Sequence, residues 1–75
     1  PEVEVPASEG APLARLLVER GMAASRKEAE RLIAQGAVSL DGEKIADPRL
    51  AVTLRPGEAL LVRAGKLKLE RWVAR

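Results

Sequence analysis

The strongest constraint on the fold is a capped helix that leads directly into a hairpin turn. Ser25 and Glu28 form an S-x-x-E capping box, a common signature of a helix N-terminus. Gly36 is typical of the left-handed residue that ends a helix. Asp41-Gly42 is a strong signal for a type I′ turn between two antiparallel strands. This order predicts a helix that is followed at once by an antiparallel hairpin.

The two-residue turn sets the register of a hairpin over residues 37–45. It pairs Val38 with Ile45 and Ser39 with Lys44. Because side chains alternate along a strand, we expect Val38 and Ile45 to face the core. Ser39 and Lys44 are then expected on the opposite side of the strands.

The capped helix, expected over residues 25–35, has a shorter helix before it and strands after it. Residues 11–20 predict this first helix, with Pro12 at its first position and Gly21 as its stop. Three further strands are expected after the hairpin, over residues 51–54, 59–64 and 67–73. The predicted fold is therefore α+β, with two packed short helices followed by a small antiparallel sheet of four to five strands.

The first ten residues differ from the rest of the chain in charge. They hold three of the 11 acidic residues, two prolines and no base, a composition that favours an extended linker. The rest of the chain carries all 13 basic residues and a charge of +5, which suggests a polyanionic partner. We therefore expect residues 1–10 to link an upstream domain to a folded domain over residues 11–75.

Several classes of chemistry are excluded by the residue types present. The chain has no Cys and no His, so zinc fingers, thiol nucleophiles and histidine-based acid–base catalysis are absent. It also has no P-loop and no G-x-G-x-x-G motif, and its carboxylates are scattered. No apolar run reaches the roughly 18 residues that a membrane span needs. We expect no catalytic residue, no metal site, no membrane partner and a location in a reducing cytoplasm.

Two groups of basic side chains are candidates for contacting the polyanion. Arg26, Lys27 and Arg31 lie near the start of the capped helix, where free backbone N–H groups also favour anions. The other group lies at the end of the chain, where residues 63–75 hold five basic residues and one acidic residue, and Lys44 of the first predicted hairpin adds one more cation. The contacts predicted from this group are Lys44, Lys66 and Lys68. An ordinary solvated charged face is the alternative interpretation of the helix group.

The last hairpin decides how the second group is arranged. A two-residue turn at Ala64-Gly65 would place Arg63 directly opposite Lys66, a pairing that is unfavourable without a counterion. Trp72, the only aromatic residue, is expected to cover the core from the sheet edge rather than stack on a base. If the helix start and both hairpins form one basic surface, that surface would bind phosphates mainly through counterion release.

The segment from Leu13 to Ile45 closely resembles the RNA-binding domain first seen in bacterial ribosomal protein S-four of the small subunit. That family joins a helix, a G-L-A-x-S-R turn, a helix with E-A-x-R-L-I, and a hairpin of the form G-x-V-x-V-N-G-x-x-V. Here Met22 replaces the usual Leu, and Asp41-Gly42 stands for Asn-Gly. The resemblance implies the alpha-L RNA-binding motif. Its RNA-binding residues carry over to Ser25, Arg26, Lys27, Arg31 and Lys44.

The flanking segments resemble the C-terminal region of bacterial tyrosyl-tRNA synthetases. The leader Pro-Glu-Val-Glu-Val-Pro and the ending over residues 61–73 carry this similarity. It implies a non-catalytic module that binds tRNA-Tyr at the long variable arm and near the anticodon stem, with Lys66 and Lys68 as further contacts. It also implies that ATP and tyrosine bind only on an absent catalytic domain, through which the full-length enzyme forms a homodimer.

Two alternatives stay open from the sequence. The first is a small standalone member of the same RNA-binding family that acts on ribosomal RNA or a ribosomal subunit. The second is a protein-interaction domain whose basic face is incidental.

Overall fold

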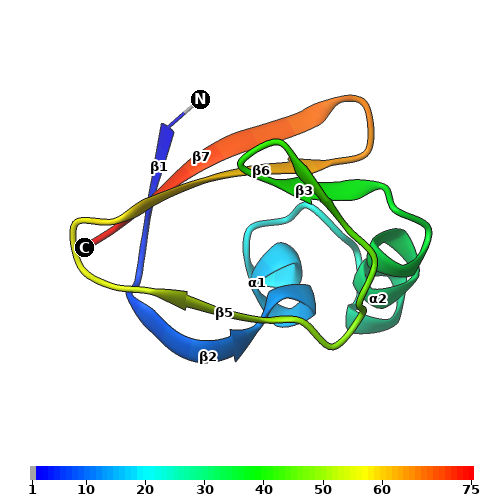
Figure 1. Cartoon of the computed structure of the whole chain (residues 1–75), viewed down its shortest axis with the longest axis horizontal. Coiled ribbons are helices and arrows are strands. Elements are labelled where there is room, and N and C mark those ends of the chain that lie inside the picture. Colours follow the sequence, from blue (N-terminus) through cyan, green and yellow to red (C-terminus); the bar gives the residue numbers. More distant parts are fainter. Residues whose placement is uncertain (1) are drawn as a thin grey trace.

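Two short helices pack between a five-stranded sheet and a two-stranded sheet in a computed structural model that describes residues 2–75 (Figure 1). Along the chain the elements are β1 (Glu2–Val5), β2 (Ser8–Pro12), α1 (Leu13–Glu19), α2 (Arg26–Ala34), β3 (Val38–Leu40), β4 (Glu43–Ile45), β5 (Ala51–Leu54), β6 (Ala59–Ala64) and β7 (Lys68–Ala74). The large sheet has the order β1-β7-β6-β3-β4, and β2 pairs with β5. The predicted α+β class is confirmed. The large sheet is mixed rather than antiparallel, because β1 joins β7 in parallel.

One core lies between the two sheets. Both helices contribute to it, and the large sheet closes it with the inward-facing side chains of β3, β6 and β7. The most completely buried large side chains are Trp72, Leu13, Leu17, Ile33, Val38 and Val62. No helix within residues 2–75 is long and apolar enough to cross a membrane.

Helix α2 begins and ends where the local signals predict. Ser25 is extended, and its Oγ accepts a hydrogen bond from the Glu28 N–H at 3.1 Å. Helix α1 begins one residue later than the predicted Pro12 position. Pro12 still belongs to β2, and the Leu13 N–H donates to the Leu50 carbonyl at 2.9 Å. Pairing with β5 therefore keeps the chain extended up to Pro12.

The first hairpin has the predicted register, with Val38 opposite Ile45 and Ser39 opposite Lys44. Asp41 has a φ of 51°, and the next residue also has a positive φ, as a type I′ turn requires. Asp41 also ties the turn to β6. Its Oδ1 accepts the Leu61 N–H at 2.8 Å, and its own N–H donates to the Leu61 carbonyl at 2.7 Å.

Gly36 connects α2 to this hairpin at a position with a φ of +74°. A Cβ there would lie 3.1 Å from Cδ of Lys44. We expect Gly36→Ala to lower stability by more than the roughly 1 kcal/mol that positive φ alone costs an L-residue. Thermal unfolding of both variants tests this, with Gly21→Ala as the matched control. Gly21 has the same φ but open space around it. Equal losses in the two variants would show that the Lys44 contact contributes nothing.

The register of the last hairpin differs from the prediction. A three-residue loop, Gly65 to Leu67, replaces the expected two-residue turn, and Arg63 lies opposite Leu69 rather than Lys66. The predicted register would have turned Leu67 and Leu69 toward the core. The observed register instead buries Trp72, which is 1 % exposed, while Leu67 is 95 % exposed. Burying the largest apolar side chain outweighs the preference for a two-residue turn.

The segment expected to be a linker forms strands of the folded domain. β1 runs parallel to β7, with Glu2 opposite Arg71, and Arg71 donates to Glu2 at 2.7 Å. Val5 is buried at the end of this strand, and Pro6 lies between β1 and β2. Residues 2–10 therefore belong to the fold, whereas Pro1 lies outside the described residues. The connection to an upstream domain stays a prediction.

Candidate nucleic-acid interface

Helix α2 carries the first group of predicted cations. Lys27 and Arg31 are exposed one helical turn apart, and both line a shallow hollow beside Pro48. Arg26 is exposed as well, but its guanidinium lies 3.7 Å from the carboxylate of Glu30. The hydroxyl of Ser25 already accepts the capping bond described above. Lys27 and Arg31 are therefore the freest polar groups of this helix for an outside anion.

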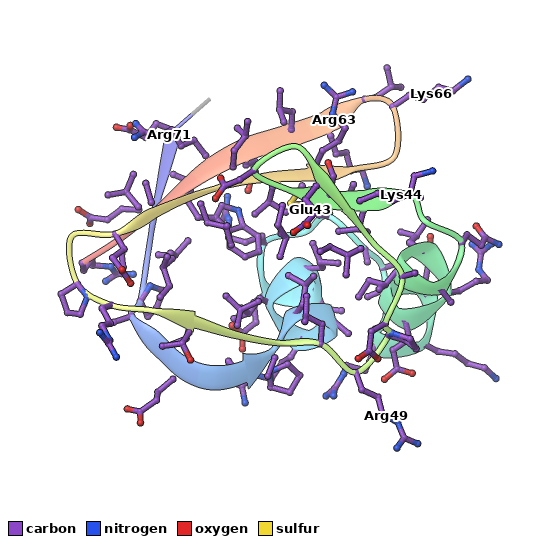
Figure 2. The ribbon with its side chains drawn as sticks, viewed as in Figure 1. Glu43, Lys44, Arg49, Arg63, Lys66 and Arg71 are labelled. Atoms are coloured by element: carbon purple, nitrogen blue, oxygen red, sulfur yellow. The ribbon has the colours of Figure 1, made fainter. Side chains whose placement is uncertain are left out.

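Two hairpin cations, Lys44 and Arg63, lie on the outer face of the large sheet, away from the helices. Lys44 and Arg63 are both directly opposite Ser39, one from each side of β3. Figure 2 shows Arg63 and Lys66 projecting from the same end of the sheet, with Lys44 near that end. The stem of Lys44 passes over Gly36 at the end of α2. Lys44 therefore links the outer face to the helical side.

Lys68 points to the other side of the sheet from Arg63. It pairs with the buried Ala64, and its Nζ donates to the carbonyl of Met22 at 3.3 Å. The ammonium thus lies at the loop between α1 and α2, where two of its hydrogens remain for other acceptors. The cations therefore do not form the single basic surface that was expected. They form two neighbouring groups, one on the helical side and one on the outer sheet face.

Most of the predicted basic contacts have no ion-pair partner among the described residues. Within residues 2–75 the ion pairs use Arg15, Arg20, Arg26, Arg71 and Arg75. The other eight of the 13 basic side chains have no carboxylate within 4 Å in this part of the chain. They include every predicted basic contact except Arg26. Unpaired cations are the groups that a phosphate can engage without breaking an existing interaction.

Arg63 is a cation of this surface that the predicted contact set omitted. The expected turn placed it against Lys66, whereas the structure sets it across Ser39 from Lys44. The signal that could have found it is the position of Trp72 along the last strand. Placing that side chain in the core fixes the register of β7 against β6, and with it the outward direction of Arg63.

A carboxylate lies on the same face of β7 as Lys68. Glu70 of β7 accepts from Nε and Nη2 of Arg20 at 3.1 and 3.2 Å, and from Nε1 of Trp72 at 3.0 Å. Burial raises the pKa of Glu70, but the hydrogen bonds from Arg20 and Trp72 and the Arg20 charge outweigh it, so this pKa lies below its ordinary value. Glu70 is therefore ionised at neutral pH.

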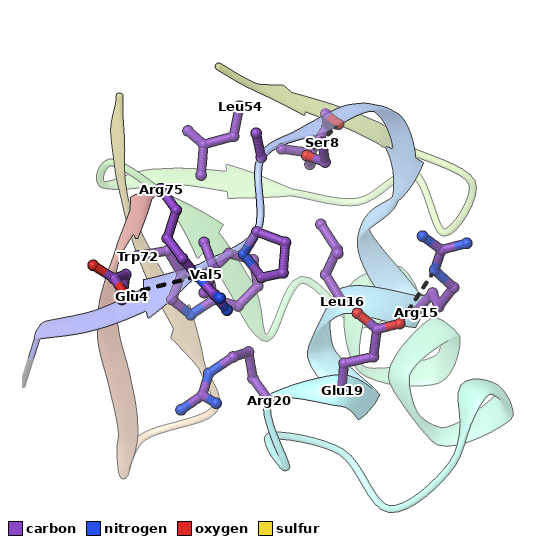
Figure 3. A pocket seen from close by; sticks show the side chains of 13 residues that line it. Glu4, Val5, Ser8, Arg15, Leu16, Glu19, Arg20, Leu54, Trp72 and Arg75 are labelled. Carbon is purple, nitrogen blue, oxygen red and sulfur yellow. Dashed lines mark hydrogen bonds and ion pairs between the residues drawn. The ribbon is translucent and has the colours of Figure 1, made fainter. Parts of the chain in front are cut away.

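A separate cavity of about 290 Å³ lies between β1, α1 and β5 (Figure 3). Its rim arginines are each paired with a glutamate, as Arg15 is with Glu19 at 3.5 Å and Arg75 with Glu4 at 3.7 Å. The seven predicted contact residues all lie outside its lining. Within residues 2–75, no group of three or more acidic side chains is placed to hold a metal ion.

Comparison with known proteins identifies the family. The S4 domain model matches residues 12–60, from the last residue of β2 to the first residues of β6. The chain belongs to the S4 domain family. The S4 match contains both helices, the hairpin and β5, and thus Ser25, Arg26, Lys27, Arg31 and Lys44. Lys66, Lys68 and Glu70 lie beyond it.

Relatives of this S4 domain extend the similarity over the whole chain. The tyrosine–tRNA ligase of Bdellovibrio bacteriovorus is 44 % identical over 75 residues, which cover 100 % of this chain and 18 % of the relative. That of Symbiobacterium thermophilum is 49 % identical over 75 residues, covering 97 % of this chain and 18 % of the relative. That of Moorella thermoacetica is 51 % identical over 59 residues, covering 79 % and 14 %. The chain therefore spans less than a fifth of the length of these curated relatives.

Proposed function

We propose that this S4 domain binds RNA through the exposed cations of α2 and of the β3–β4 hairpin. The observation that carries the proposal is the pair Lys27 and Arg31. These two like charges stand one turn apart on an exposed face, with no carboxylate within 4 Å in residues 2–75. Such a pair repels itself slightly in the free protein, and a bound phosphate backbone removes that cost. Lys44, Lys66 and Lys68 extend the contact from the sheet.

We further propose that the RNA is tRNA-Tyr and that the domain serves a tyrosine–tRNA ligase. The support is the similarity to such ligases over the full chain. On this proposal the domain holds the long variable arm and the anticodon stem and takes no part in the chemical steps. ATP and tyrosine bind elsewhere in a longer, homodimeric cytoplasmic enzyme.

A salt titration of tRNA-Tyr binding tests the proposal. We expect the logarithm of the association constant to fall linearly with the logarithm of salt concentration. If each of the five cations named in the proposal contacts one phosphate, the slope is about −4.5 at about −0.9 for each phosphate. Fluorescence anisotropy of a labelled tRNA-Tyr transcript measures it at several KCl concentrations.

The matched competitor is a tRNA with a short variable arm. It should bind more weakly than tRNA-Tyr at the same salt concentration. Equal binding of both RNAs would overturn the assignment to the variable arm while leaving RNA binding in place. A flat response to salt would overturn phosphate recognition, and with it the proposed function.

A further inference from the structure

Strand β7 holds the start of the α1–α2 loop by a fork-shaped ion pair. Arg20 is the last residue of the α1 turn, and its guanidinium presents two nitrogens to the two oxygens of Glu70. Nε1 of Trp72 donates to one of these oxygens at 3.0 Å. The Glu70 side chain is 20 % exposed and that of Arg20 is 32 % exposed. A bidentate pair of this kind fixes direction as well as distance.

The same strand holds the loop at a second point. Lys68 donates to the Met22 carbonyl, and the Met22 N–H donates back to the Leu17 carbonyl of α1 at 2.8 Å. Met22 is 3 % exposed and Ala23 is 6 % exposed, so this part of the loop is anchored in the core. The inner face of β7 therefore holds the chain at two points, Arg20 and Met22, which are two residues apart.

Helix α2 starts directly after these anchors. Ser25, its N-cap, follows Met22 by three residues, and Lys27 lies in the first turn of the helix. A shift of the loop would move the first turn and both free cations of α2 together, because the helix is a rigid element. Side chains that contact a ligand need to be held within about half an ångström of their productive position.

We propose that Glu70 is a positioning residue for RNA binding, which acts through Arg20 to set the place of Lys27 and Arg31. This inference rests on the proposed RNA-binding function. On this inference a domain that binds an anion needs an acidic side chain to hold its cations in place.

The proposal predicts an effect of opposite sign from simple electrostatics. Glu70 is ionised and repels phosphate, so charge alone predicts that Glu70→Gln tightens RNA binding. Positioning predicts that this variant weakens binding by about tenfold, the scale of one charge-assisted hydrogen-bond network. It also predicts a shallower salt slope, although no cation has been removed, because Lys27 and Arg31 no longer both reach phosphates.

The experiment compares Glu70→Gln with Glu43→Gln in the same tRNA-Tyr titration. Glu43 is an exposed residue of β4 that takes part in no ion pair within residues 2–75, and its replacement makes the same change in charge. Glu43→Gln should keep or slightly raise the wild-type affinity and keep the salt slope. Circular dichroism at the binding temperature confirms that each variant is folded, so that a loss of stability alone does not lower binding.

Arg20→Lys is the second variant, which decides the matter if Glu70→Gln does not fold. It keeps the charge of Arg20 but not the two-nitrogen fork, and it should weaken binding and flatten the salt slope. Wild-type affinity and slope in a folded Glu70→Gln or Arg20→Lys domain would overturn the positioning role while RNA binding stands. A wild-type domain without salt-dependent RNA binding would overturn the proposed function itself, and the positioning role with it.

Discussion

Replacement of both Lys27 and Arg31 by glutamate is expected to weaken RNA binding by at least about a hundredfold while the domain stays folded. Each residue supplies a charge-assisted contact to a phosphate, and such contacts contribute about 1.5–3 kcal/mol each. Both side chains are exposed, and neither forms an ion pair within residues 2–75, so the fold loses no ion pair. Anisotropy titration with tRNA-Tyr measures the loss, and circular dichroism measures the fold.

The control moves the same charge change to the opposite end of the molecule. Arg55→Glu combined with Arg75→Glu also exchanges two cations for two anions. Both residues lie near the C-terminus marked in Figure 1, where the Gly57 N–H donates to the Ala74 carbonyl. This double variant should lose much less affinity, because only long-range charge connects it to the α2 surface. Arg75→Glu also removes the ion pair with Glu4, so circular dichroism checks that this variant is folded. A similar loss in both double variants would show that net charge, and not the α2 surface, determines binding.

Replacement of Trp72 by alanine is expected to unfold most of the domain or to lower its melting temperature by at least about 12 °C. Trp72 is 1 % exposed and is the largest fully buried side chain. Large-to-small changes of a buried aromatic cost about 3–5 kcal/mol, and a chain of this size has few kcal/mol to lose. The temperature shift follows from about 4 °C for each kcal/mol in small domains. Thermal unfolding by circular dichroism measures it.

Two companion variants show which part of Trp72 matters. Trp72→Phe keeps most of the buried ring but removes the N–H that Glu70 accepts. It should cost less than the alanine variant. Leu67→Ala removes an apolar side chain that is 95 % exposed, and its melting temperature should stay close to that of the wild type. A Trp72→Ala domain as stable as Leu67→Ala would contradict the place of Trp72 in the core.

The elements that were predictable from sequence are those specified by neighbouring residues. The start of α2 depends on Ser25 and Glu28, three residues apart, and the first hairpin on Asp41 and Gly42. The register of β6 with β7 depends on which distant side chains share the core. The turn signal at Ala64-Gly65 was too weak to decide it, and the burial of Trp72 did. β1 was missed because its pairing joins residues at the two ends of the chain.

The candidate site divides in the same way. Lys27 and Arg31 could be placed on one exposed helix face from their spacing alone. Lys66 and Lys68 could not, because the face that each one occupies depends on the register of the last hairpin. The sequence pattern grouped these two lysines, whereas in the structure Lys66 projects from the end of the β6–β7 hairpin and Lys68 contacts the α1–α2 loop. The bond between Glu70 and Arg20 joins residues 50 positions apart and has no local signal.

The parallel pairing of β1 with β7 has a consequence for how the domain is made. Among these strands β1 leaves the ribosome before the others and its partner β7 leaves after them, so Val3 and Val5 lack their β7 neighbours until β7 has been made. Pairings between distant residues form slowly, because a long loop must close before any contact repays the lost entropy. A nascent chain that stalls before residue 71 has neither the partner of its first strand nor its tryptophan. The domain is therefore completed in one late step, because β7 supplies both the partner of β1 and the tryptophan of the core.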